Sequence, residues 1–315
     1  MYVPKDRETK MNKQLIALET ALGQSTIEQI KEPFMLERGV ELYLKRDDLL
    51  HPIISGNKWR KLKYILDHAL SCGTHTLISM GGAYSNHLHA LAYTGKILGI
   101  KTVGMIRGEQ PQNLNATLKD LQQWGMQLHF VSRSEYRQLR EYKQFDSLPK
   151  LKKGEYWLPE GGAVELALQG VAELLDEIDM DYDCLCVPCG TATTLAGLIC
   201  AAPQNKQVLG FSALKGAGFL IDDINCLIKY SSCHNNEWFV HLDYHFGGFA
   251  KQNSELLQFI KQFEEKHLIP LEPIYTGKML YGIYDLIQQG YFKAGQKIIA
   301  LHTGGLQGNR GAFNA

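Results

Sequence analysis

The sequence lacks a surplus of charge of either sign, because its 315 residues contain 33 Lys and Arg against 33 Asp and Glu. A chain without net charge gives no reason to expect nucleic acid or an anionic membrane as its main partner. No run approaches the ~20 apolar residues that a membrane span needs. Residues 1–14 are polar and charged, unlike a signal peptide. We therefore expect a cytoplasmic protein with no membrane or nucleic-acid partner.

Metal-ligand spacing is also missing. Cys186 and Cys189 form a CxxC match, but the match has no second pair and no paired His motif at zinc spacing. His87 and His89 are two residues apart, so on a helix they face different directions. We expect no metal site, and we expect the seven scattered cysteines to be reduced thiols.

What the chain does contain is enough apolar material, 45% of its residues, to bury a large core in one large or two modest domains. Short apolar runs alternate with segments of helical spacing. Strands are expected at residues 40–45, 76–80, 101–106, 126–131, 184–187, 208–213 and 297–302, and helices at 14–22, 57–69, 85–98, 113–124, 164–178, 193–202, 254–266 and 279–289. This alternation predicts parallel sheets covered by helices. The charged stretch 132–155 separates two such series, which indicates two α/β domains.

Three segments rich in glycine and hydroxyl side chains follow expected strands, at residues 81–87, 188–194 and 302–305. Ligands of open parallel sheets bind beyond the carboxyl ends of the strands. Glycine lets an anion approach the N–H groups at a helix N-terminus, so residues 190–194 favour binding of one phosphate group. The alternative is ordinary N-capping of helices. The absence of GxGxxG and of a Walker GK[ST] ending disfavours an NAD- or ATP-binding protein.

Lys58 stands out because it follows a glycine-containing loop and opens an expected helix. The neighbouring Arg60 and Lys61 and the helix N-terminus are expected to push its amine toward the neutral form, which is the form that attacks an aldehyde. The alternative for this segment taken alone is a basic helix start on the surface.

Six motifs together carry a family resemblance. They are LKRDD (44–48), SGNKWRKL (55–62), GGAYSN (81–86), LPEGG (158–162), CGTATT (189–194) and EPIYTGK (272–278). With these motifs the chain resembles the fold-type II pyridoxal-phosphate (PLP) enzymes, in the branch of 1-aminocyclopropane-1-carboxylate (ACC) deaminase and D-cysteine desulfhydrase. The motifs keep the family's order from residue 42 to residue 305, and residues 1–10 precede them as an extra tail.

The resemblance implies a tryptophan-synthase-β-like fold of two three-layer α/β domains with mainly parallel sheets. The active site is expected in the cleft between them. Residues 1–60 and 162–315 would form the larger, PLP-binding domain, and residues 61–161 a smaller domain inserted in it. A homodimer is expected on the same ground.

The resemblance also implies how the cofactor is bound. Lys58 matches the lysine that forms a Schiff base with PLP, and Lys61 a lysine that supports the phosphate. Asn86 matches an asparagine beside the PLP 3-hydroxyl. The residues that match the phosphate-binding loop are Cys189, Gly190, Thr191, Ala192, Thr193 and Thr194.

On the substrate side, Ser85 matches a serine at the substrate carboxylate, with Asn86 and His87 beside it. Tyr275 matches a tyrosine near the reacting carbon, although without the resemblance plain packing would explain it better. The implied catalytic residues are therefore Lys58, Ser85 and Tyr275, with Lys58 as the general base.

Thr276 departs from the deaminase pattern, in which a glutamate faces the pyridine nitrogen of PLP. A carboxylate keeps that nitrogen protonated and the ring a strong electron sink, whereas a hydroxyl tunes the ring more weakly. Loss of a thiolate needs less assistance than opening of a cyclopropane. Thr276 therefore favours α,β-elimination of D-cysteine, a small amino acid, to pyruvate, sulfide and ammonia. The alternatives are an ACC deaminase that forms 2-oxobutanoate and ammonia, and a PLP-binding homologue without catalytic activity.

Overall fold

The computed structural model describes residues 11–229 and 236–312, so the expectation of a tail at residues 1–10 lies outside the described residues. The strands are β1 (Ile27–Ile30), β2 (Glu41–Lys45), β3 (Thr76–Gly81), β4 (Lys101–Arg107), β5 (Gln127–Val131), β6 (Glu155–Leu158), β7 (Cys184–Cys189), β8 (Gln207–Ser212), β9 (Trp238–His241) and β10 (Lys297–Leu301). The α-helices are α1 (Lys13–Thr20), α2 (Pro33–Arg38), α3 (Asn57–Ser71), α4 (Asn86–Leu98), α5 (Ala116–Gln123), α6 (Arg133–Leu139), α7 (Leu166–Ala172), α8 (Thr193–Ala201), α9 (Phe219–Lys229), α10 (Ser254–His267), α11 (Thr276–Gln288) and α12 (Asn309–Ala312). Short 3-10 turns η1 (Asp47–Leu49), η2 (Glu160–Gly162), η3 (Leu175–Glu177) and η4 (Leu306–Gly308) connect them.

The strands form two sheets. The larger sheet has the order β1-β2-β10-β7-β8-β9, in which β1 and β2 pair antiparallel and all other neighbours pair in parallel. The smaller sheet has the order β5-β4-β3-β6 and is parallel throughout. The expected α/β fold with mainly parallel sheets is confirmed.

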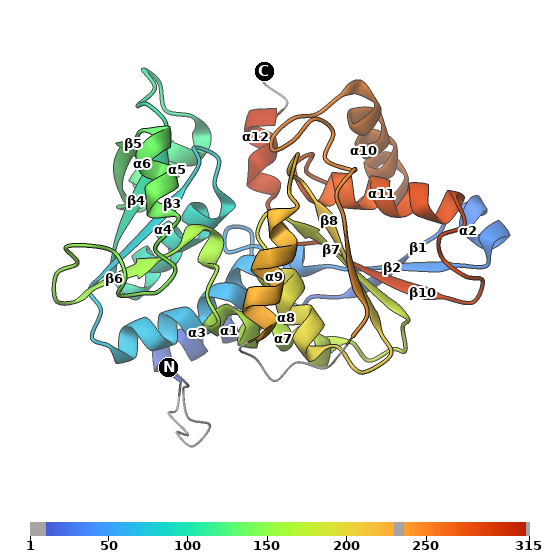
Figure 1. The fold of residues 1–315 in the computed structure, drawn as a ribbon, viewed down its shortest axis with the longest axis horizontal. Coiled ribbons are helices and arrows are strands. Elements are labelled where there is room, and N and C mark those ends of the chain that lie inside the picture. The colour runs from blue at the N-terminus through green and yellow to red at the C-terminus, as the bar shows by residue number, and fades with distance from the viewer. Residues whose placement is uncertain (1–10, 230–235, 313–315) are drawn as a thin grey trace.

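Helices cover both faces of the larger sheet, which gives it three layers (Figure 1). On one face, Leu280 of α11 belongs to the same buried cluster as Ile298 of β10. On the other face, Leu195 of α8 belongs to a cluster with Val187 of β7. Helix α3 leads from the larger sheet to the smaller one and packs on α7 (Figure 1). The start of α3, which carries Lys58, therefore lies where the chain passes from the larger sheet to the smaller one.

The structure differs from the sequence-based expectation in several short elements. The strands β1, β6 and β9 have only four residues each, too few for a clear period, and were not predicted. The stretch 132–155 contains α6 and leads into β6, which pairs with β3 of the smaller sheet. The expected helix at 164–178 is broken into α7 and η3.

The structure can be compared with the expectations for the cysteines, for membrane spans and for metal sites. Cys72, Cys184, Cys186, Cys189 and Cys226 are free thiols, but Cys200 is disulfide-bonded, so the expectation of reduced thiols throughout is wrong. Within residues 11–229 and 236–312, no helix is long and apolar enough to cross a membrane. The same residues contain no group of three or more His, Cys, Asp or Glu side chains suited to a metal ion.

Candidate active site

The strands β2, β10 and β7 are neighbours in the larger sheet and run in parallel, so their carboxyl ends lie at the same side of the sheet. The segments that follow them are the loop before Lys58, residues 302–305 and residues 190–194. The loop after β2 ends at Gly56, which has a φ of +60° and is the N-cap of α3. A Cβ atom on Gly56 would lie 1.8 Å from the Thr303 carbonyl oxygen, in the segment that follows β10. Glycine is required there, because both the backbone conformation and the close approach exclude a side chain. The Lys58 loop and the 302–305 segment therefore lie against each other.

Lys58 is the second residue of α3, and its Nζ donates to Asn57 Oδ1 at 2.6 Å. Asn57 Nδ2 in turn donates to Thr194 Oγ1 at 3.0 Å, which links Lys58 to the 190–194 loop. Burial lowers the pKa of Lys58 to about 8, opposed by the charge of Glu272. The sequence analysis named the charges of Arg60 and Lys61 and the helix N-terminus as the cause, but burial is the largest one. The neutral amine arises mainly from desolvation.

The loop after β7 has the features of a phosphate site. Lys61 Nζ lies 3.2 Å from Thr191 Oγ1, and burial together with the charge of Lys58 lowers the pKa of Lys61 well below its ordinary value. Thr193 opens α8, and its buried Oγ1 has no hydrogen-bond partner among the described residues. A Cβ atom on Gly190 would lie 2.6 Å from the Tyr275 ring. A helix N-terminus, an orphaned hydroxyl and a desolvated cation together fit a phosphate group.

The segment after β3 places Ser85 and His87 differently. Ser85 is the N-cap of α4, and its Oγ accepts from the Leu88 N–H at 3.2 Å. The buried His87 ring contacts Ser79 Oγ through Nε2 at 2.8 Å, and Ser79 donates to the Leu158 carbonyl. The single hydroxyl proton of Ser79 is donated to Leu158, so Ser79 Oγ accepts from His87 Nε2–H. His87 Nδ1 is then an unprotonated acceptor without a partner among the described residues. Burial and the nearby lysines lower the pKa of His87 to about 3, so the ring is neutral.

Tyr275 and Thr276 are held at the start of α11 by Glu272, which opens the EPIYTGK motif but was given no role of its own in the sequence analysis. The buried Glu272 carboxylate accepts from the N–H groups of Tyr275 and Thr276 at 2.9 and 2.6 Å. Thr276 Oγ1 donates to Glu272 Oε1 at 3.1 Å. Burial raises the pKa of Tyr275, which keeps its hydroxyl protonated. An acidic residue four positions before a helix start is the signal by which Glu272 was detectable.

One small cavity joins several of these segments. Its lining residues are Pro52, Ile53, Ser55, Lys58, Asn86, His89, Gly305, Leu306 and Gln307. Lys58 and Asn86 thus line one cavity. Gln307 was not predicted to belong to the site.

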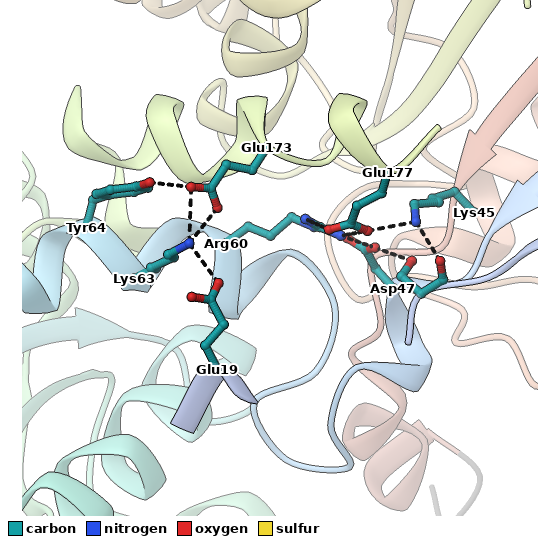
Figure 2. A network of polar contacts seen from close by, with 9 residues as sticks. Glu19, Lys45, Asp47, Arg60, Lys63, Tyr64, Glu173 and Glu177 are labelled. Atoms are coloured by element: carbon teal, nitrogen blue, oxygen red, sulfur yellow. Dashed lines mark hydrogen bonds and ion pairs between the residues drawn. The ribbon is translucent and has the colours of Figure 1, made fainter. Parts of the chain in front are cut away.

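A network of ion pairs, partly buried, anchors the first turns of α3 (Figure 2). Arg60 donates to both carboxylate oxygens of Asp47, at 2.7 and 2.8 Å, and to Glu177 of η3 at 2.8 Å. Lys45 Nζ, at the end of β2, reaches Glu177 at 2.8 Å. Lys45 and Asp47 of the LKRDD motif therefore have a structural role, because they tie α3 to β2 and η3.

Comparison with known proteins gives the class directly. The chain belongs to the pyridoxal-phosphate dependent enzymes, whose family model matches residues 20–304. Its cofactor is accordingly PLP, which the loop after β7 and the partly buried Lys58 fit. More particularly, it is 30% identical to a putative 1-aminocyclopropane-1-carboxylate deaminase of Pyrococcus horikoshii, over 86% of each chain.

Two further relatives support the same branch. A bifunctional D-cysteine desulfhydrase/1-aminocyclopropane-1-carboxylate deaminase of Arabidopsis thaliana mitochondria is 29% identical, over 87% of this chain and 74% of that one. The crystal structure of an ACC deaminase homologue superposes with a TM-score of 0.75 at 27% identity, over 95% of this chain and 97% of that chain. The sequence-based assignment to this branch is confirmed.

The lowered pKa of Lys58 makes a pH prediction. A lysine with a pKa of about 8 reaches its neutral form about two pH units below an ordinary lysine near 10.4. In the cofactor-free protein, labelling of Lys58 by an amine reagent should therefore rise to about pH 8 and level off above it. Peptide mass spectrometry reports the labelling, with the exposed Lys293 as an internal calibration of the reagent. A continued rise of Lys58 labelling to pH 10 would contradict the lowered pKa.

Proposed function

We propose that the chain is a PLP-dependent lyase that converts D-cysteine and water to pyruvate, hydrogen sulfide and ammonia. The observation that carries this proposal is Thr276, a neutral hydroxyl at the position where the deaminase pattern has a carboxylate. Because Thr276 Oγ1 donates to Glu272, it offers only a lone pair to the ring nitrogen. Such a partner suits loss of a good leaving group such as a thiolate better than the opening of a cyclopropane.

The cofactor in this proposal is bound covalently by Lys58 and held by Asn86 and Thr276 at its ring. Its phosphate would be held by Lys61 and by the loop residues Cys189, Gly190, Thr191, Ala192, Thr193 and Thr194. When bound, PLP supplies an electron sink for the charge that develops at the substrate α-carbon. Phosphate binding gives the orphaned Thr193 hydroxyl a partner and the desolvated Lys61 a counter-charge.

The proton transfers are assigned to the chain's own side chains. Lys58 Nζ takes the α-proton, since a pKa near 8 leaves an appreciable neutral fraction at neutral pH. Ser85 uses its hydroxyl proton, which the N-cap bond does not need, to bind the substrate carboxylate. Asn86 and His87 complete the carboxylate side. Tyr275 remains protonated and donates to the departing sulfur.

A substrate panel tests the proposal. D-cysteine, L-cysteine, D-serine, β-chloro-D-alanine and ACC are offered to the PLP-loaded protein, and pyruvate, 2-oxobutanoate and sulfide are measured. We expect sulfide and pyruvate in equal amounts from D-cysteine. Release of 2-oxobutanoate from ACC without turnover of D-cysteine would instead support the deaminase alternative. Cofactor absorbance without any product would identify a homologue that has lost catalysis.

The organisation of the chain around this site is part of the proposal. We infer a smaller domain at residues 61–161 inserted in a larger, cofactor-binding domain of residues 1–60 and 162–315, with the active site in the cleft between them. All strands of the smaller sheet fall within residues 76–158, which supports this division. A homodimer in the cytoplasm remains a proposal by family resemblance.

A further inference from the structure

Gln307 is the second residue of η4, and it connects the carboxyl-terminal segment to the site. Its Nε2 donates to Asn86 Oδ1 at 2.5 Å and lies 3.4 Å from the Tyr84 carbonyl oxygen. Its Oε1 accepts from Thr117 Oγ1 at 2.7 Å and lies 3.4 Å from Arg310 Nη2. Each side of the Gln307 amide therefore has two polar neighbours.

These neighbours fix which way the Gln307 amide points. A guanidinium can only donate and a backbone carbonyl can only accept. Arg310 must therefore face the oxygen of Gln307, and the Tyr84 carbonyl must face its nitrogen. Arg310 is itself held by Asp120 of α5 at 2.6 Å. The orientation of Gln307 is thus set from outside the site.

The orientation of Asn86 follows from that of Gln307. Because Gln307 gives an N–H to Asn86, the amide oxygen of Asn86 is turned toward Gln307. A Cβ atom on Gly305 would lie 2.6 Å from Asn86 Nδ2, so the nitrogen faces Gly305. Asn86 and Gly305 line the same cavity as Lys58. The group that Asn86 presents beside Lys58 is therefore a hydrogen-bond donor.

We propose that Gln307 is a positioning residue that keeps Asn86 as a donor for an anionic ligand oxygen, namely the 3-oxygen of PLP. This inference rests on the cofactor role proposed for Asn86. The oxygen and the nitrogen of an amide are nearly equal in size, so a free Asn86 amide would adopt either of two orientations. The flipped orientation would place its carbonyl oxygen against the anion. The carboxyl-terminal segment thus determines the polarity of a contact that it does not itself make.

Two substitutions of opposite character test the inference. Gln307→Glu keeps the shape and the oxygens that face Thr117 and Arg310, but it removes the N–H that Asn86 accepts. Asn86 then turns its nitrogen toward the carboxylate that this substitution introduces, and its oxygen toward the cofactor. We expect the PLP dissociation constant to rise about 10- to 100-fold, the range of one hydrogen bond to a charged group. Gln307→Leu lets Asn86 rotate freely, so its effect should stay below about fivefold.

The dissociation constant is measured by titration of the cofactor-free protein with PLP, followed by visible absorbance and tryptophan fluorescence. A second cycle repeats Gln307→Glu in an Asn86→Ala background, where no amide remains to be turned, and we expect less than about a threefold effect there. Arg310→Leu, which removes the outer donor, should shift the affinity in the same direction by a smaller amount. Thermal unfolding of the cofactor-free variants checks that all of them fold, and Arg310→Leu carries the test if Gln307→Glu does not.

The outcomes separate this inference from the proposed function. Weaker binding in Gln307→Leu than in Gln307→Glu would overturn it, because a merely structural role predicts that order. Persistence of the full effect in the Asn86→Ala background would also overturn it, since the cause would then be the added charge alone. The titration needs no substrate, so a protein that binds PLP in the expected order but releases no pyruvate refutes only the proposed function.

Discussion

Replacing Lys58 with alanine is expected to remove the visible absorbance of the covalent lysine–cofactor bond and to lower product release by at least about 10³-fold. The pKa of Lys58 is lowered to about 8, so part of its amine is neutral at neutral pH, and Lys58 and Asn86 line one cavity. The substitution therefore removes both the covalent attachment and the general base. Absorbance of the purified protein and pyruvate release from D-cysteine measure the two effects separately.

The matched control is Lys58→Arg, which keeps a cation at this position but cannot form the covalent bond. It should lose as much activity as the alanine variant, because the amine chemistry and not the charge is required. Lys61→Ala should keep the covalent attachment and mainly weaken cofactor affinity. A Lys58→Ala protein that retains both the visible band and turnover would refute the assignment of Lys58.

Replacing Arg60 with methionine is expected to lower the free energy of unfolding by about 3–5 kcal/mol, the range for breaking a buried ion pair. Asp47 is fully buried, and its two oxygens accept from Arg60. Among residues 11–229 and 236–312, Arg60 is the only ion-pair partner of Asp47, so its loss leaves the Asp47 carboxylate without a direct counter-charge (Figure 2). Chemical denaturation of the wild type and the variant gives the difference.

A double variant and an exposed pair serve as controls for Arg60. Arg60→Met combined with Asp47→Asn should recover part of the loss, because the uncompensated charge is then gone. Lys261→Met breaks an ion pair with Glu265 whose side chains are 76% and 65% exposed, and it should cost less than about 0.5 kcal/mol. Equal losses for Arg60→Met and Lys261→Met would contradict the importance of burial.

The fold class was predictable because the alternation of apolar runs with helical spacing is a local signal, whereas the site residues were assigned only through the six motifs taken together. Lys58 and the 190–194 loop are marked by glycine and threonine at strand-to-helix junctions, and the structure places both at one edge of the larger sheet. Gln307 was not predictable, because its partner Asn86 lies 221 residues away in the sequence. The cause of the low Lys58 pKa was predicted wrongly for the same reason. Burial depends on elements distant in the sequence, whereas Arg60 and Lys61 are merely its neighbours.

The place of β10 in the larger sheet also constrains how the protein is made. β10 is the last strand in the sequence, yet it pairs with β2 on one side and with β7 on the other. While the chain is being synthesised, the smaller sheet has all its strands by residue 158, but the larger sheet has a gap at its centre until residue 301 has left the ribosome. Because 302–305 and Gln307 follow β10 directly, the residues that line the cavity beside Lys58 are complete only after residue 307 has been synthesised. In this topology the larger sheet therefore depends on pairing between strands far apart in the sequence, and the cavity beside Lys58 depends on the same late pairing.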